Sequence, residues 1–287
     1  MAPPAAVRFD VSRSPIRLPA ARSRAVALVL GSEILLCGGL TSTGTTTGSI
    51  VSIDPGSSRA SGSGTLATPV HDAAGAVLGG SGFLFGGGSV YAGAVVERIG
   101  SAGDATAIGH LPAVRADLAA VLVDGEIVVV GGGTPARPDD RVLATTDGRH
   151  FRTVATLIVG VRYPAVAVVG GMVYVIGGST LSADTDLIQA VDPLTGVVRI
   201  VGHLAHRLSH ASAFVLGGTL LIAGGRVAGR AQDRLWQLDI ASGIVTSAGQ
   251  LPYPVSDAAM AVIAGTGYLI GGEGVGPLAS IITIAAR

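Results

Sequence analysis

Short apolar runs alternate along the chain with polar turns that contain glycine, and six of these runs end in a glycine pair. The second glycines of the pairs are Gly39, Gly87, Gly132, Gly178, Gly225 and Gly272, which are 48, 45, 46, 47 and 47 residues apart. Short apolar runs bounded by turns are typical of buried strands. A period of this length suits a propeller blade of four strands, so the pattern predicts six blades along nearly the whole chain.

Every repeat has the same internal order. A leucine opens the repeat, and a strand of small apolar residues, a glycine-containing turn and the run that ends in the glycine pair follow. The third strand ends at an aspartate in four repeats, at Asp54, Asp147, Asp192 and Asp239, where aspartate favours a turn into a fourth strand. No long stretch shows a period of 3.6 residues. We therefore predict an all-β, six-bladed β-propeller with four-stranded antiparallel blades in a single domain.

The opening leucines set the bounds of the predicted blades. These blades span about residues 18–65, 66–110, 111–156, 157–203, 204–250 and 251–287. The last repeat has room for only three strands before the chain ends. We expect residues 6–17 to supply its fourth strand, from Ala6 to Ser12, because pairing the two termini removes an exposed sheet edge.

Composition limits the partners that this protein can have. The chain has 287 residues, of which 13% are charged, and a formal net charge of +0. Nothing therefore attracts nucleic acid or an anionic membrane over a long range, and we expect no nucleic-acid partner. No apolar run reaches the roughly 18 residues of a membrane-spanning helix, so we expect no membrane insertion. Cys37 is the only cysteine, which excludes an internal disulfide.

The repeat resembles the kelch repeat, as in the central domain of galactose oxidase, over essentially the whole chain. The glycine pair at the end of the second strand carries this resemblance. The chain departs from the family in the fourth strand, where a tryptophan is usual: Phe151 is the only aromatic residue there, and Trp236 lies in a third strand. The high usage of Ala, Gly, Val and Arg, with no Lys, is typical of a GC-rich bacterial genome. Because kelch-like propellers of bacteria are often exported, we expect an extracytoplasmic or secreted protein, with a cytoplasmic one as the alternative, since the N-terminus lacks signal-peptide features.

One column of polar residues marks a candidate site. Fifteen residues before the second glycine, at the expected mouth of the central channel, the six repeats have Arg24, Asp72, Asp117, Tyr163, His210 and Asp257. We call these six residues the mouth ring, and positions just before them add His71, Arg115 and Arg162 as candidate ligand-binding residues. Three carboxylates and one guanidinium give the mouth ring a formal charge of −2 with histidine neutral, which favours a cation or a polyhydroxylated ligand over a phosphate. The alternative is a structural ring in which Arg24 bridges Asp72 and Asp257.

Catalytic, metal and cofactor motifs are not found in the sequence. His206 and His210 are four residues apart, but on a segment that leads into a strand and not on a helix, so we predict no zinc site. A copper oxidase resembling galactose oxidase would need a Cys–Tyr pair at the metal, whereas Cys37 is expected to pack as a small apolar residue in a second strand. No Ser-His-Asp or phosphate-loop motif is present either.

Three functions remain open at this point. The first is a non-catalytic binding or interaction module, a monomer, that presents the mouth ring and adjoining loops to a glycan, a peptide or a protein. The alternative is a carbohydrate-active enzyme of the hydrolase or epimerase type that uses Asp72, Asp117 and Asp257 as acid and base. A third is a scaffold whose partner binds the outer edges of the blades. The fold alone does not decide between them.

Overall fold

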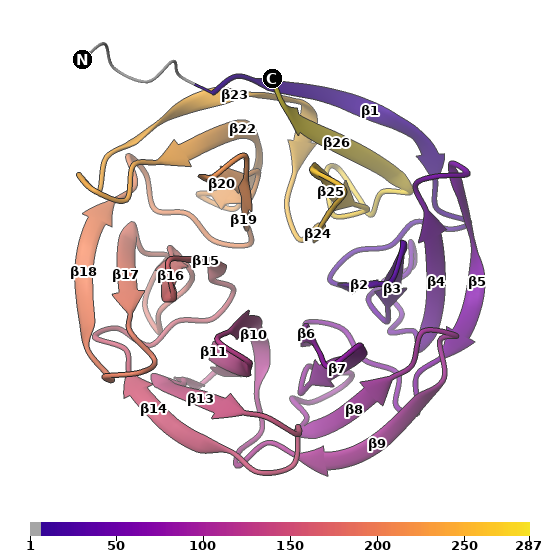
Figure 1. Cartoon of the computed structure of the whole chain (residues 1–287), viewed down its shortest axis with the longest axis horizontal. Coiled ribbons are helices and arrows are strands. Elements are labelled where there is room, and N and C mark those ends of the chain that lie inside the picture. Colours follow the sequence, from indigo (N-terminus) through magenta and orange to yellow (C-terminus); the bar gives the residue numbers. More distant parts are fainter. Residues whose placement is uncertain (1–6) are drawn as a thin grey trace.

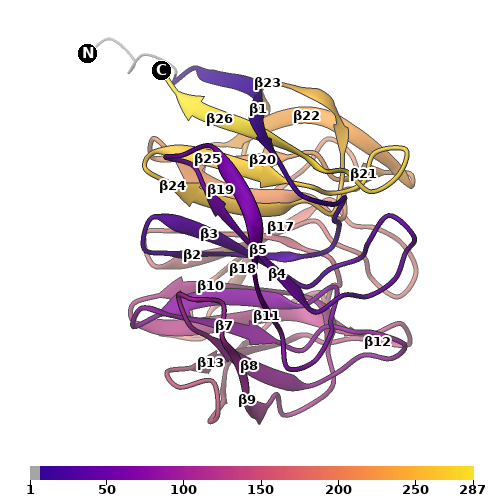
Figure 2. The same cartoon turned by 90° about the vertical axis from the view of Figure 1, so that its right-hand side faces the viewer.

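The computed structural model describes residues 7–287, and within this range the regular elements are all strands. The strands form six antiparallel sheets around a central channel, so the protein is a six-bladed β-propeller (Figure 1). In the side view of Figure 2, loops that contain the short strands β12 and β21 extend on one face of the ring. No helix among the described residues is long and apolar enough to cross a membrane.

Each blade begins with a short strand beside the channel and ends with a strand at the rim. The first three blades consist of β2 (Val26–Leu30), β3 (Glu33–Cys37), β4 (Ser49–Asp54) and β5 (Arg59–Thr65); β6 (Ala74–Leu78), β7 (Ser81–Phe85), β8 (Val95–Ile99) and β9 (Ala105–His110); and β10 (Ala116–Val123), β11 (Glu126–Thr134), β13 (Arg141–Thr145) and β14 (Arg152–Thr156), with β12 (Arg137–Pro138) paired to β11. The next three consist of β15 (Ala165–Val169), β16 (Met172–Ile176), β17 (Leu187–Val191) and β18 (Val198–His203); β19 (Ser212–Leu216), β20 (Thr219–Ala223), β22 (Arg230–Leu238) and β23 (Val245–Val255), with β21 (Arg226–Val227) paired to β22; and β24 (Ala259–Ile263), β25 (Thr266–Ile270), β26 (Ser280–Ala286) and β1 (Phe9–Arg17).

The N-terminal strand closes the ring, as the sequence predicts. β1 pairs antiparallel with β26, from Phe9 opposite Ala286 to Arg17 opposite Ser280. Its predicted bounds are wrong, because the strand continues to Arg17 instead of ending at Ser12; the predicted start, Ala6, lies outside the described residues. A register shift between Arg13 and Arg17 lets the strand continue, and Ile16 becomes buried in the core between blades 6 and 1.

The glycine pairs join each blade to the next one. The N–H of each second glycine donates a hydrogen bond to a backbone carbonyl of the segment that leads into the following blade, over 2.7 to 2.9 Å; in blade 1 this bond runs from Gly39 to Val70. Gly38 has a φ of +65°, and a Cβ built there would lie 2.3 Å from the Val70 carbonyl oxygen. A side chain has no room at this joint, which explains why the glycine pair recurs in every repeat.

The hydrophobic core is divided into six clusters that lie between neighbouring blades. The cluster between blades 1 and 2, for example, packs Leu28 and Leu35 against Leu84 and Ile99. Cys37 is buried in the same cluster, as expected, and burial raises the pKa of its thiol to about 12. Because each blade packs chiefly against its two neighbours, the rigidity of the channel mouth depends on closure of the whole ring.

Candidate functional site

All six mouth-ring residues have a left-handed backbone conformation. Their φ values lie between +53° and +63°. In this conformation each backbone N–H donates to the backbone carbonyl of the mouth-ring residue in the preceding blade, with N···O distances of 2.8 to 3.2 Å. Asp72 donates in this way to Arg24, and Arg24 donates to Asp257 of the last blade. Six hydrogen bonds therefore form a closed circle around the channel mouth.

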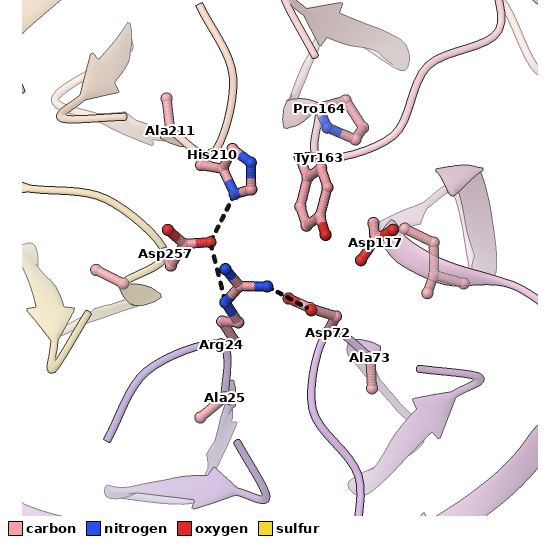
Figure 3. A pocket seen from close by; sticks show the side chains of 12 residues that line it. Arg24, Ala25, Asp72, Ala73, Asp117, Tyr163, Pro164, His210, Ala211 and Asp257 are labelled. Carbon is pink, nitrogen blue, oxygen red and sulfur yellow. Dashed lines mark hydrogen bonds and ion pairs between the residues drawn. The ribbon is translucent and has the colours of Figure 1, made fainter. Parts of the chain in front are cut away.

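Arg24 bridges the carboxylates on its two sides, as the structural alternative for the ring expects (Figure 3). Its Nη1 lies 3.1 Å from Oδ2 of Asp72, and its Nε lies 3.8 Å from Oδ1 of Asp257. The same Nε donates to Oε1 of Glu273 at 3.0 Å. The Asp72 and Asp257 side chains are 8% and 3% exposed, so these charges pair in surroundings with little water.

Asp257 is held from several sides. Its Oδ1 lies 2.6 Å from Nδ1 of His210, and its Oδ2 accepts a hydrogen bond from the Ser256 hydroxyl at 2.7 Å. Nη2 of Arg226 lies 2.8 Å from the same Oδ2 and also pairs with Glu273. Burial on its own raises the pKa of Asp257, but the hydrogen bond and charge of His210, together with Arg226 and Arg24, outweigh it and hold this pKa below its ordinary value.

Arg226 and Glu273 belong to this network although the sequence analysis does not single them out. Each directly follows a glycine pair, at Gly225 and Gly272, and pairs by a β-bridge with the residue just before the mouth ring, Ser209 and Ser256. The position after the glycine pairs is therefore a second column that faces the mouth. Aligning that column would have found both residues.

The other side of the mouth is formed by an aromatic stack. The rings of Tyr163 and His210 stack with centroids 3.8 Å apart and an interplanar angle of 25°. The Tyr163 hydroxyl points toward Asp117 in Figure 3, and the Asp117 carboxylate pairs with the Arg162 guanidinium. The Arg162 guanidinium also lies over the Tyr163 ring, 5.1 Å from its centroid.

Asp72 differs from Asp257 in its protonation. Burial, with the nearby charges of Asp117 and Asp257, raises the pKa of Asp72 to about 7, although Arg24 opposes this rise. Burial and the same kind of neighbouring negative charge, from Asp72 and Asp117, also raise the pKa of the Tyr163 hydroxyl. The mouth thus combines a carboxylate whose pKa is lowered, Asp257, with one whose pKa is raised to about 7, Asp72.

The space enclosed by these residues is a small polar cleft above an apolar channel. The cleft has a volume of about 120 Å³ and is lined by the mouth ring and the residue that follows each of its members. Below it, small apolar side chains such as Ala27, Val166 and Ala213 line the channel. A ligand at the mouth would find polar groups in the cleft and apolar groups beneath them.

The three further candidate residues lie in different surroundings. Arg162 contacts the mouth through Asp117, and Nε2 of His71 lies 3.7 Å from Oδ2 of Asp72. Burial, with the charge of Arg24, lowers the pKa of His71. Arg115 is fully buried, where its guanidinium donates to the Arg141 carbonyl and pairs with Asp139. Arg115 therefore stabilises blade 3 from inside and does not line the cleft.

Nothing among the described residues indicates a metal centre. Among residues 7–287, no group of three or more His, Cys, Asp or Glu side chains is arranged to hold a metal ion. The mouth-ring carboxylates instead pair with Arg24, Arg162 and Arg226.

Comparison with known proteins supports the fold. No protein-family profile and no curated protein matches the sequence. Among solved structures, a structure of YjhT is similar, with a TM-score of 0.80 and 13% sequence identity, covering 94% of this chain and 99% of that one. At this identity the similarity shows the six-bladed propeller and does not extend to function.

Proposed function

We propose that this protein is a binding module whose channel mouth recognises a carbohydrate. The observation that carries the proposal is the left-handed backbone at all six mouth-ring positions. Glycine adopts this conformation most easily, and the chain uses glycine at the joints between blades. Polar side chains nevertheless occupy all six mouth positions, where the conformation costs a residue such as Arg24 or Tyr163 roughly 1–2 kcal/mol and aspartate or histidine less. Such strain, repeated around one opening, favours a role of the side chains in binding.

The chemistry of the mouth suits a polyhydroxylated ligand. Sugar hydroxyls both donate and accept hydrogen bonds, and the cleft offers carboxylates, guanidinium groups, the Tyr163 phenol and the His210 imidazole. These groups are fixed by their mutual pairing, which lowers the entropy lost on binding. A cleft of about 120 Å³ accommodates part of a sugar, and the loops around the mouth contact the remainder.

We also propose that the six repeats are divergent kelch repeats. The steric role of the glycine pair at the joint between blades, as at Gly38 and Gly39, accounts for its retention. The tryptophan of the fourth strand is absent, and leucines such as Leu66, Leu111 and Leu204 occupy the inter-blade core.

Calorimetric titration with a panel of neutral and acidic mono- and disaccharides tests the binding function. We expect at least one saccharide to bind the wild type and to bind Asp117→Asn at least about tenfold more weakly, because a hydrogen bond to a charged group contributes roughly 1.5–3 kcal/mol. Asp239→Asn is the matched control, since Asp239 lies in an exposed turn. Equal affinity of the wild type and Asp117→Asn would place the binding site elsewhere.

The Asp72 carboxyl favours a second candidate function. A group with a pKa of about 7 is well suited to transfer protons at neutral pH, as a carbohydrate hydrolase or epimerase requires. In that case Asp72→Asn would bind the saccharide and fail to convert it. A wild-type protein that binds the saccharide and returns it unchanged after prolonged incubation supports the binding module.

A further inference from the structure

A second cavity lies in the outer part of blade 5, apart from the mouth. It has a volume of about 180 Å³ and a mainly apolar lining of Leu204, Leu208, Val227, Trp236 and Val245. Trp236 is the only tryptophan of the chain. The cavity lies between strands β22 and β23 and the segment 204–208, which leads into the next channel strand.

The position of Trp236 has a defined role in two other blades. In blade 2 it is Glu97, whose side chain is buried and whose carboxylate accepts hydrogen bonds from the backbone N–H groups of Ala67 and Thr68 at 2.9 and 2.8 Å. In blade 4 it is Gln189, whose amide accepts from the Val159 N–H at 3.0 Å. In both blades this side chain accepts hydrogen bonds from backbone N–H groups just after the leucine that opens the repeat.

Blades 1, 3 and 6 have an apolar side chain at the position of Trp236. These side chains are Val51, Leu143 and Ile282, and the residue after the opening leucine is then a proline, which has no N–H: Pro19, Pro112 and Pro252. Proline removes the first of the two backbone donors in these three blades, whereas the second position keeps an N–H, as at Ala20 and Ala113.

Blade 5 has neither a polar side chain at the position of Trp236 nor a proline after its opening leucine. Ala205 follows the opening leucine and has an N–H, yet Trp236 has no acceptor to offer it. Among the residues that the structure describes, the N–H groups of Ala205 and His206 make no hydrogen bond. Segment 204–206 bends at the same two positions as segment 66–68, where the Glu97 carboxylate is bound. Two exposed backbone N–H groups without a protein acceptor thus border an apolar cavity.

We propose that this cavity binds a compact apolar carboxylate. The ligand carboxylate accepts hydrogen bonds from the N–H groups of Ala205 and His206, as the Glu97 carboxylate does from Ala67 and Thr68, and its apolar body packs against Trp236. A dry apolar cavity of about 150 Å³ binds benzene, so a space of about 180 Å³ accommodates one aromatic ring. The site is independent of the mouth ring and of the carbohydrate proposal.

Titration with phenylacetate, followed by tryptophan fluorescence, tests the proposal directly because Trp236 is the only tryptophan. We expect a saturable change in the wild type. We expect Ala205→Pro to bind at least about tenfold more weakly, because proline removes one donor to a charged group. Pro19 and Pro112 occupy the equivalent bend in blades 1 and 3, so this variant fits the local backbone. No saturable change in the wild type, or equal affinity of Ala205→Pro, would overturn the proposal.

Three further measurements sharpen the test. Phenylacetamide, which lacks the charge, should bind at least about tenfold more weakly than phenylacetate, and equal binding would refute the carboxylate contact. Trp236→Gln, which reproduces the Gln189 arrangement, should lose phenylacetate in ligand-observed NMR while remaining folded by circular dichroism; retained binding would refute the site. A short peptide that ends in phenylalanine with a free carboxyl group distinguishes a chain terminus from a free acid as the natural source. Asp72→Asn should bind phenylacetate like the wild type, which separates this site from the mouth.

Discussion

Tyr163 and His210 are stacked across the boundary between blades 4 and 5, with their ring centroids 3.8 Å apart. Their backbones are joined as well, because the His210 N–H donates to the Tyr163 carbonyl at 3.2 Å. His210 in turn contacts Asp257 through Nδ1. The orientation of three successive mouth-ring residues is therefore coupled through side chains as well as through the backbone circle.

The left-handed backbone at Tyr163 predicts an inverted order of stability for two substitutions. Tyr163→Gly should be more stable than Tyr163→Ala by about 1 kcal/mol, because only glycine adopts a φ of +53° without strain. In an ordinary strand the order is the reverse, since glycine adds entropy to the unfolded chain. Urea unfolding of both variants measures the difference. A more stable Tyr163→Ala would show that the position is not strained.

The raised pKa of Asp72 predicts a pH dependence of stability. Its folded-state pKa of about 7 lies above the ordinary value of about 3.9, so between these pH values the folded protein binds more protons than the unfolded chain. Stability from this group is therefore present at low pH and is lost as pH rises toward and through 7.

Asp72→Asn does not titrate and serves as the reference. From pH 5 to pH 8 the stability of the wild type should fall relative to Asp72→Asn by more than about 1 kcal/mol, as measured by urea unfolding at each pH. The lowered pKa of Asp257 acts with the opposite sign and in another window, below about pH 4. A stability difference that stays constant from pH 5 to pH 8 would contradict the perturbed Asp72.

The blade pattern and the mouth ring are predictable from sequence because both depend on local spacing. The glycine pairs recur wherever a second strand meets the next blade, and each mouth residue lies at a fixed distance before them. Arg226 and Glu273 can be found in the column after the glycine pairs, but their ion pairs cannot be predicted there, because these arise from contacts between blades 5, 6 and 1 that side-chain conformations determine. The mouth charge predicted from the ring alone therefore omits two of the groups that set it.

Two other differences have physical causes that a repeat pattern does not contain. The N-terminal strand runs to Arg17 because of a local register shift, which the count of strands cannot reveal. Arg115 occupies a column that is buried in every blade and apolar in four of them, as at Val161 and Val255. Its neighbours in that column, rather than its own charge, indicate that it faces the interior.

The crowded joint between blades predicts unequal effects of two glycine substitutions. Gly38 and Gly44 both have positive φ, but a Cβ would lie 2.3 Å from a carbonyl oxygen at Gly38, whereas nothing lies within 4 Å at Gly44. Gly44→Ala should cost about 1 kcal/mol from backbone strain alone, and Gly38→Ala at least about 2 kcal/mol more. Chemical unfolding of both variants compares them, and equal losses would remove the steric explanation for the glycine pair.

Ring closure by β1 predicts the effect of an N-terminal deletion. Removal of residues 1–17 exposes the edge of β26 and leaves the space of the buried Ile16 empty. Stability should fall by at least about 3 kcal/mol, and the protein should aggregate on heating. Thermal unfolding with light scattering measures both effects, with a deletion of residues 1–6 as the control. A truncated protein that melts like the wild type would show that β1 does not close the ring.

We propose above all that the mouth ring binds a ligand in addition to joining the six blades around the channel mouth. The most direct test is calorimetric titration of the wild type and Tyr163→Gly with the saccharide panel, combined with urea unfolding of the same two proteins. Our account predicts that Tyr163→Gly keeps its stability within about 1 kcal/mol, because relief of backbone strain offsets the lost stacking, and that its affinity falls at least about tenfold. A variant that loses stability and binds as well as the wild type, or a wild type that binds no saccharide of the panel, would contradict it.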